Sequence, residues 1–254
     1  CIRDRLSMDL FSDQKIAEKS ILYMLFFPAG FFLSVAYTES LFLFCVLLAF
    51  FAGQRRIWFL AGIAGFFAAL TRSPGIFLFP ALLWLYMEQK KWMFKKIDFR
   101  ILFLALIPTG LLLVLWIGYN TTGDWLAPLN AQAAWQRHLT WPWVTLFAPP
   151  DNSRPHFNQV EWVSLVLFIV LSIFALIRLP SRSYGIYALL ALVPILLSGS
   201  LTSITRLCLV IFPAFWVLAT VGTRKYAFDL FISVIFISLQ AVLFAGLSQF
   251  YWAG

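Results

Sequence analysis

The sequence predicts an all-α, polytopic transmembrane protein, and three observations lead to this fold class. Hydrophobic residues make up 62% of the 254 residues and charged residues only 12%, whereas a soluble domain has about 45–50% apolar and about 25% charged residues. The apolar residues gather in long runs that short basic clusters separate. These runs, such as FLFCVLLAFFAG, lack the period-two alternation of barrel strands. Because helices satisfy their own backbone polar groups in lipid, we expect a helical bundle.

The basic clusters predict the orientation of the helices. All but four of the 19 Lys and Arg residues fall into six clusters, which we place on the cytoplasmic side by the positive-inside rule. The clusters are Arg3/Arg5, Lys15/Lys19, Arg55/Arg56, Lys90/Lys91/Lys95/Lys96/Arg100, Arg178/Arg182 and Arg224/Lys225. This orientation accounts for the formal charge of +8, so membrane lipid is an expected partner and nucleic acid is not.

Nine apolar runs lie between these clusters and predict about nine crossing or partly crossing helices in one transmembrane domain, residues 1–254. The runs are 20–36, 40–53, 57–70, 75–88, 101–118, 162–177, 184–199, 207–222 and 226–247. Several are shorter than the ~20 residues that cross a bilayer core. Either turn residues lengthen these helices, or their outer ends stop below the surface around a water-filled cavity. Residues 1–19 are expected to be a cytoplasmic lead-in.

Residues 119–160 form a long outer segment that is rich in tryptophan. Within it, LNAQAAWQRHL predicts a short helix along the membrane surface, and Trp141-Pro142-Trp143 suits the interface, where indole rings settle. Arg137 lies between Trp135 and Trp141. It can grip a lipid phosphate or stack on a sugar, and interfacial packing alone explains it equally well.

Three charged residues fall at outer turns between apolar runs: Glu39 in YTES, Arg72 in TRSPG and Arg206 in TSITR. Because the turns belong to separate hairpins, we expect these side chains to converge on one face of the bundle. A charge at membrane depth costs about 2.5–3.5 kcal/mol on insertion scales, so such groups usually line a functional cavity or pair with each other. A Glu39–Arg72 salt bridge that ties two hairpins together, with Arg206 snorkelling at its turn, is the simpler explanation.

Several kinds of site are absent from the sequence. It contains no P-loop, no GxGxxG, no HExxH and no paired-carboxylate motif of the kind that supports metal-dependent sugar transfer. The three cysteines, Cys1, Cys45 and Cys208, have no metal-like spacing. We therefore expect neither a metal nor a cofactor.

Two segments resemble the PIG-V-like mannosyltransferases, a family of the GT-C class that includes the enzyme adding the second mannose in GPI-anchor assembly and its bacterial relatives. These segments are FFPAGFFLSVAYTESLFLF and WFLAGIAGFFAALTRSPGIFLFPALL. The elements that carry the resemblance are Pro28, Tyr37, Thr38, Glu39, Ser40, Thr71, Arg72 and Gly75. WQRHLTWPW and SLTSITRLCLVIFPAF also look like the bacterial branch, so the resemblance covers roughly residues 14–220.

The resemblance implies an inverting transfer of mannose from polyprenyl-phosphate-mannose to an outward-facing lipid-linked or glycan acceptor. The lipid-phosphate donor is a substrate, and the membrane is the bacterial plasma membrane or the endoplasmic reticulum, with the site facing away from the cytosol. The family's catalytic carboxylate lies in a Trp-Asp-Gly-like outer loop with no match here, so we expect it upstream of Cys1. Glu39 is a weak candidate for that role.

The expected substrate- and phosphate-binding residues combine charged and aromatic side chains from the outer turns and the outer segment. They are Tyr37, Glu39, Arg72, Arg137, Trp141 and Arg206. Arginine suits a phosphate because its planar fork matches the oxygens. Two other functions stay open: a transporter or flippase for a lipid-linked or anionic solute, and a non-catalytic membrane scaffold.

Overall fold

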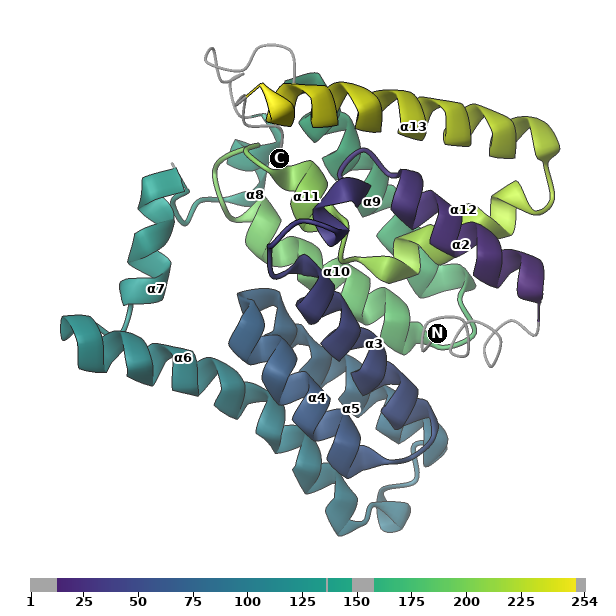
Figure 1. The fold of residues 1–254 in the computed structure, drawn as a ribbon. Helices are drawn as coiled ribbons and strands as arrows, with labels where there is room; N and C mark the ends of the chain where they lie inside the picture. The colour runs from purple at the N-terminus through teal and green to yellow at the C-terminus, as the bar shows by residue number, and fades with distance from the viewer. Residues whose placement is uncertain (1–12, 136, 148–157, 250–254) are drawn as a thin grey trace.

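The computed structural model describes residues 13–135, 137–147 and 158–249, and every regular element within them is a helix (Figure 1). The longer helices are α2 (Gln14–Phe26), α3 (Glu39–Gln54), α4 (Trp58–Thr71), α5 (Leu78–Gln89), α6 (Leu106–Thr122), α9 (Asn158–Arg178), α10 (Arg182–Leu196), α12 (Phe212–Gly222) and α13 (Tyr226–Ser248). Short elements lie between them: η1 (Gly30–Leu33), η2 (Ser73–Phe77), η3 (Phe94–Lys96), η4 (Phe99–Ala105), α7 (Ala127–Asn130), η5 (Ala131–Trp135), α8 (Pro142–Leu146) and α11 (Ile204–Cys208). The predicted all-α class is confirmed for the described part of the chain.

Three helical segments are long and apolar enough to cross a membrane. They are Phe99–Thr122, which joins η4 to α6, Asn158–Arg178 and Tyr226–Ser248, with 24, 21 and 23 residues. Helices of this length and composition indicate association with a membrane. The structure supports this coarser statement and not the nine predicted crossings, because α3, α4, α10 and α12 are apolar but only 16, 14, 15 and 11 residues long.

The first helix differs from the prediction at both ends. α2 begins at Gln14, within the expected lead-in 1–19, because the side chain of Asp13 accepts a hydrogen bond from the Lys15 N–H and caps the helix. It ends at Phe26, ten residues before the end of the apolar run 20–36. Pro28 lies just beyond the cap, where it cannot continue a helix. Residues 1–12 of the lead-in lie outside the described part of the chain.

The helices form two groups. α3, α4, α5 and α6 pack together in one group, and α2, α9, α12 and α13 make up the other, while α10 contacts α5, α9 and α12 (Figure 1). Aromatic side chains fill the junction between the groups. Phe50 of α3 stacks on Tyr184 of α10 with 4.8 Å between ring centroids, and Phe212 of α12 contacts Trp216 edge to face at 4.8 Å. Phe50 also contacts Phe212 at 5.6 Å, so this buried aromatic core joins α3 to α10 and α12.

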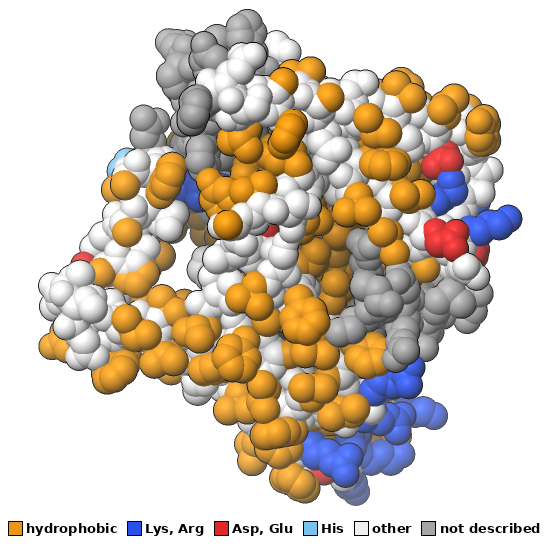
Figure 2. All heavy atoms as spheres, viewed as in Figure 1, with side chains coloured by type: hydrophobic (Ala, Val, Ile, Leu, Met, Phe, Trp, Pro, Cys, Tyr) orange, Lys and Arg blue, Asp and Glu red, His pale blue; other side chains and the backbone are white. Residues whose placement is uncertain are grey.

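Basic side chains gather at one end of the first group. Arg55 caps the end of α3, Arg56 follows it, and Lys90 caps the end of α5. Figure 2 shows Lys and Arg side chains clustered at the lower edge of the molecule, where these helix ends lie in Figure 1. Glu39 begins α3 at the opposite end. The hairpins therefore separate a solvated basic end from the end that carries the candidate site.

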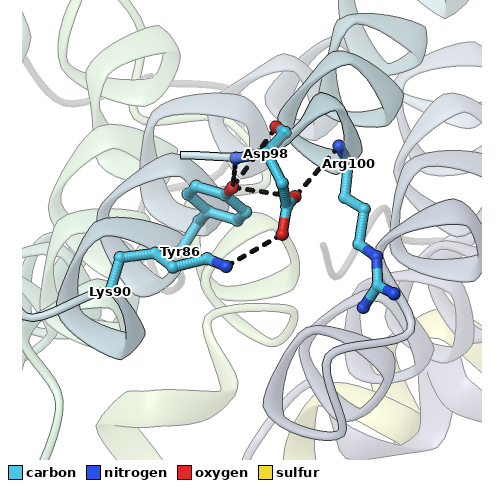
Figure 3. A network of polar contacts seen from close by, with 4 residues as sticks. All are labelled: Tyr86, Lys90, Asp98 and Arg100. Atoms are coloured by element: carbon cyan, nitrogen blue, oxygen red, sulfur yellow. Dashed lines mark hydrogen bonds and ion pairs between the residues drawn. The ribbon is translucent and has the colours of Figure 1, made fainter. Parts of the chain in front are cut away.

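A polar network at this basic end fixes the start of the longest span (Figure 3). Asp98 caps η4: its Oδ1 accepts from the Arg100 N–H at 3.1 Å and from the buried hydroxyl of Tyr86 at 3.0 Å. Its Oδ2 accepts from Lys90 Nζ at 2.9 Å. The hydrogen bond from Lys90 lowers the pKa of Asp98 below its ordinary value, and those from Tyr86 and the Arg100 N–H act in the same direction.

We predict that Asp98→Asn lowers the unfolding temperature of the protein in detergent at pH 7. Because folding lowers the pKa of Asp98, its ionised form stabilises the folded state above the ordinary pKa of about 3.9, and this contribution is lost as the pH falls through the folded value. The difference in unfolding temperature between wild type and variant should therefore shrink below about pH 4. Lys96→Gln, in the same loop, is the matched control and should leave the unfolding temperature unchanged. A difference that is constant with pH would contradict the prediction.

Candidate functional site

Glu39 is the first residue of α3, and its side chain is buried, with 1% of its surface exposed. The helix starts here after an irregular stretch that follows η1, and the Ser40 hydroxyl ties this start back to the Leu33 carbonyl at 2.5 Å. A carboxylate in the first turn of a helix is stabilised by the positive end of the helix dipole. The start of a helix is therefore a suitable place for this buried carboxylate.

Arg72 meets Glu39 from the next hairpin. α4 ends at Thr71, and Arg72 takes an extended conformation, with φ −151° and ψ 143°. The helix breaks at Arg72, whereas Ser73, directly before Pro74, already begins η2. The Arg72 Nη1 donates to Glu39 Oε1 at 2.5 Å.

Gly75 fixes the turn that carries Arg72. A Cβ atom at Gly75 would lie 2.4–2.5 Å from backbone atoms of Ala68 and Ala69 on α4, closer than real Cβ atoms come to a neighbour. The turn can therefore fold back onto α4 only with glycine at this position. This contact gives a physical reason for the Thr71-Arg72-x-x-Gly75 element.

Arg206 completes the ion group from α11. Its Nε lies 3.3 Å from Glu39 Oε1, and its guanidinium carbon lies 4.9 Å from the ring centroid of Tyr37 and 5.4 Å from that of Phe32. Burial lowers the pKa of Arg206 from its ordinary value, and the charge of Glu39 opposes that shift. The three charges that the sequence predicts to converge do meet, and the Glu39–Arg72 salt bridge between two hairpins is present.

Arg137 reaches the same place from the outer segment. Its Nη2 donates to the Thr202 carbonyl at 2.8 Å, and its Nη1 lies 3.5 Å from Gln132 Oε1. Burial, with the nearby charges of Arg206 and Arg72, lowers the pKa of Arg137 to about 10, so it stays protonated at neutral pH. A third guanidinium group thus lies near the other two, and within the described residues it forms no ion pair with a carboxylate.

These side chains surround a cavity of about 330 Å³. It is lined by Tyr37, Arg72, Gln132, Trp135, Arg137, Ser203 and Arg206. Two polar atoms of the group, Glu39 Oε2 and Arg137 Nε, are buried and have no hydrogen-bond partner among the described residues. Figure 2 shows an opening between the arm formed by α6 and α7 and the rest of the bundle. The cavity combines positive charge with the faces of two aromatic rings.

Trp141, the remaining expected binding residue, does not line this cavity. It is 67% exposed and stacks on Trp143, with 5.1 Å between ring centroids. The reason is that the chain after Arg137 is extended and pairs with the end of α10: His138 N–H donates to Ser198 O, and Thr140 N–H to Leu197 O, both at 3.0 Å. This pairing directs the chain away from the cavity before it reaches Trp141.

The expected surface helix Leu129–Leu139 forms only in part. Helical structure continues through α7 and η5 to Trp135, and residue 136 lies outside the described residues. The last part of the outer segment, residues 148–157, also lies outside them. Trp135 of η5 lines the cavity together with Arg137, whereas the sequence had predicted Trp141 as the binding tryptophan.

Sequence reasoning missed three polar residues of the site. Gln132 and Ser203 line the cavity, and Glu161 lies buried behind it, where Thr205 donates to its Oε2 from both the backbone N–H, at 2.5 Å, and the hydroxyl, at 2.8 Å. Glu161 is a carboxylate at the start of an apolar run, the same signal that drew attention to Glu39. No sequence signal marks Ser203, whose position depends on a left-handed backbone conformation.

The site as a whole joins three guanidinium groups to two buried carboxylates. The guanidinium groups of Arg72, Arg137 and Arg206 line the cavity, whereas Glu39 and Glu161 do not. The cavity wall is therefore positive, and such a wall binds anions, above all phosphate and carboxylate groups that match the planar donor geometry of arginine. Within the described residues, no cluster of His, Cys, Asp and Glu is suited to holding a metal ion.

Comparison with known proteins adds no family to this description: no family model matches the chain, and searches of curated proteins and of solved structures gave no match.

We predict that Arg72→Gln lowers the free energy of unfolding by about 3 kcal/mol, because it leaves Glu39 buried without its closest partner. Glu39→Gln should also destabilise, since it leaves two guanidinium groups facing each other. The double variant should lose less than the sum of the two, with a coupling energy on the order of 1–3 kcal/mol. Denaturant unfolding in mixed micelles, followed by tryptophan fluorescence, measures each value. Arg178→Gln, exposed at the end of α9, is the control. Strictly additive effects would show that the pair contributes no coupling.

Proposed function

We propose that this chain is the membrane-embedded part of a GT-C-type glycosyltransferase of the PIG-V-like family. It transfers a mannose from a polyprenyl-phosphate-mannose donor to an outward-facing lipid-linked or glycan acceptor. The observation that carries this proposal is the cavity lined by Arg72, Arg137 and Arg206, from three separate segments, two of which contact the buried Glu39. The sequence elements that resemble the family, Tyr37 to Ser40 and Thr71 to Gly75, build two sides of that cavity.

The proposed topology has about nine crossings, with the short helices stopping at the cavity on the outer side. Arg55, Arg56 and Lys90 then face the cytosol, in line with the positive-inside rule. Glu39 starts α3 at the other end of the same hairpin, so the cavity opens away from the cytosol. A lipid-linked sugar in the outer leaflet presents its phosphate at this level.

The charge of the cavity suits the change that sugar transfer makes at the phosphate. In the donor, the phosphate is a diester with one negative charge. When the bond from the anomeric carbon to the phosphate oxygen breaks, the lipid keeps a phosphate monoester, whose second pKa of about 6 gives it nearly two charges at pH 7. Guanidinium groups already in place therefore stabilise the transition state more than the bound donor, which is the condition for catalysis.

Glu39 acts in this proposal by orienting the arginines. Its Oε1 is the atom that contacts both Arg72 and Arg206, and its side chain is almost wholly buried. The new bond joins the anomeric carbon to an acceptor hydroxyl oxygen, with inversion, and the hydroxyl proton passes to a general base. By the resemblance, that base is the carboxylate of a Trp-Asp-Gly-like outer loop, a motif that this sequence does not contain. Tyr37 and Trp135 line the cavity with aromatic side chains against which a sugar ring can pack.

We predict that the full-length gene product transfers mannose from polyprenyl-phosphate-mannose to a member of a panel of lipid-linked and glycan acceptors. Arg206→Gln should lower kcat by about 10²–10³, because it removes a donor at the developing phosphate charge. Arg178→Gln, exposed at the far end of α9, should keep wild-type activity. Passage of an intact lipid-linked sugar across vesicle membranes, without transfer, would instead support a transporter or flippase.

The topology is tested separately by cysteine labelling from outside intact cells or vesicles. In a Cys1→Ser background, the remaining cysteines Cys45 and Cys208 are buried. A membrane-impermeant maleimide should label Leu139→Cys, which lies at an 89% exposed position of the outer segment. It should label Lys95→Cys only after the membrane is permeabilised. The reverse pattern would invert the proposed orientation.

A further inference from the structure

Glu161 is a buried carboxylate that the proposed transfer does not use. It lies in the first turn of α9, is 8% exposed and does not line the cavity. Thr205 donates two hydrogen bonds to its Oε2, one from the backbone N–H and one from the hydroxyl. Ser164, one turn further along α9, places its Oγ 3.2 Å from that hydroxyl. Glu161 of α9 thus holds Thr205 of α11 through both the backbone and the side chain of Thr205.

The segment that Glu161 holds is strained. Ser203, which caps α11, has φ +63°, and its side chain is 2% exposed. A residue other than glycine held in this conformation costs about 1–3 kcal/mol and persists only where its surroundings enforce it. Only one residue separates Ser203 from Thr205. The hydrogen bonds from Thr205 to Glu161 therefore help to hold Ser203 in its left-handed conformation.

The strained segment also connects two of the cavity's arginines. Arg206 follows Thr205 in the chain, and Arg137 donates to the carbonyl of Thr202 at 2.8 Å. Residues 202–206 therefore set the position of one guanidinium group by covalent connection and of another by a hydrogen bond. A movement of Thr205 changes both positions at once.

We propose that Glu161 is a positioning residue for phosphate binding: its carboxylate fixes residues 202–206 so that Arg137 and Arg206 face the same cavity. The inference rests on the proposed function of that cavity, and it assigns the phosphate of the lipid donor to this pair of arginines. Glu161 acts only through them, because its carboxylate lies behind α11.

The experiment measures the affinity of the full-length protein, in detergent, for farnesyl phosphate, a soluble analogue of the lipid phosphate that remains after transfer. We expect Glu161→Ala and Arg206→Gln each to raise the Kd by about tenfold, or about 1.4 kcal/mol. The double variant should bind more tightly than the product of the two single effects predicts, because part of the effect of Glu161 passes through Arg206. Glu161→Gln, which keeps an acceptor oxygen for Thr205, should restore most of the affinity. Glu18→Gln on α2 is the matched control and should bind as wild type does.

The outcomes separate this inference from the function it rests on. Wild-type affinity in Glu161→Ala alongside weak binding in Arg206→Gln overturns the positioning role alone, as do effects that multiply in the double variant. If wild-type protein binds no farnesyl phosphate, the proposed function falls and the positioning role with it. If Glu161→Ala does not fold, Thr205→Val is measured in its place, because it removes the hydroxyl bond to Glu161 and keeps the backbone bond. Thr205→Val should then weaken the binding of farnesyl phosphate, and Thr205→Ser, which keeps a hydroxyl, should restore it.

Discussion

The ion group formed by Glu39, Arg72 and Arg206 is the interaction on which the rest of the site depends. Each member comes from a different hairpin, and a single oxygen, Glu39 Oε1, contacts both arginines. A lone buried carboxylate would cost several kcal/mol, so the three segments are held together by the penalty for separating them. The same contact has a second effect: it leaves more guanidinium groups than carboxylates at the cavity wall. Structural stabilisation and the positive charge of the cavity wall are therefore two properties of one arrangement, and the salt-bridge explanation does not compete with the proposed function.

Helical structure and the meeting of charges could be predicted from the sequence because both follow from local rules. Apolar runs bounded by basic turns give helices, and two charges at adjacent outer turns must lie at the same end of a hairpin pair. The ends of the helices, in contrast, do not coincide with the ends of the apolar runs. The cap formed by Asp13 moved the start of α2 into the expected lead-in, and between Phe26 and α3 the apolar chain forms only the short element η1. Composition does not distinguish a helix that crosses a membrane from one that stops within it.

The outer segment shows where sequence reasoning fails for the site. Arg137 was found because it lies among tryptophans, but which tryptophan accompanies it depends on a backbone pairing between residues 138–140 and 197–198. That pairing joins positions far apart in the sequence and involves no distinctive side chain. Ser203 and Glu161 were missed for a related reason, since a left-handed residue and the carboxylate that holds its neighbour are recognisable only together. Site residues whose positions depend on tertiary contacts cannot be identified from a single sequence.

Gly75 makes the two sides of the cavity unequal. Its φ is not in the left-handed region, so the requirement for glycine is purely spatial: two backbones touch where a methyl group would have to go. A contact between main chains cannot be relieved by a change of side-chain rotamer. The Arg72 side of the cavity is therefore rigid. On the other side, Gln132 and Trp135 belong to a short exposed helical turn. A change in the width of the cavity would therefore have to come from this exposed turn and not from the Arg72 side.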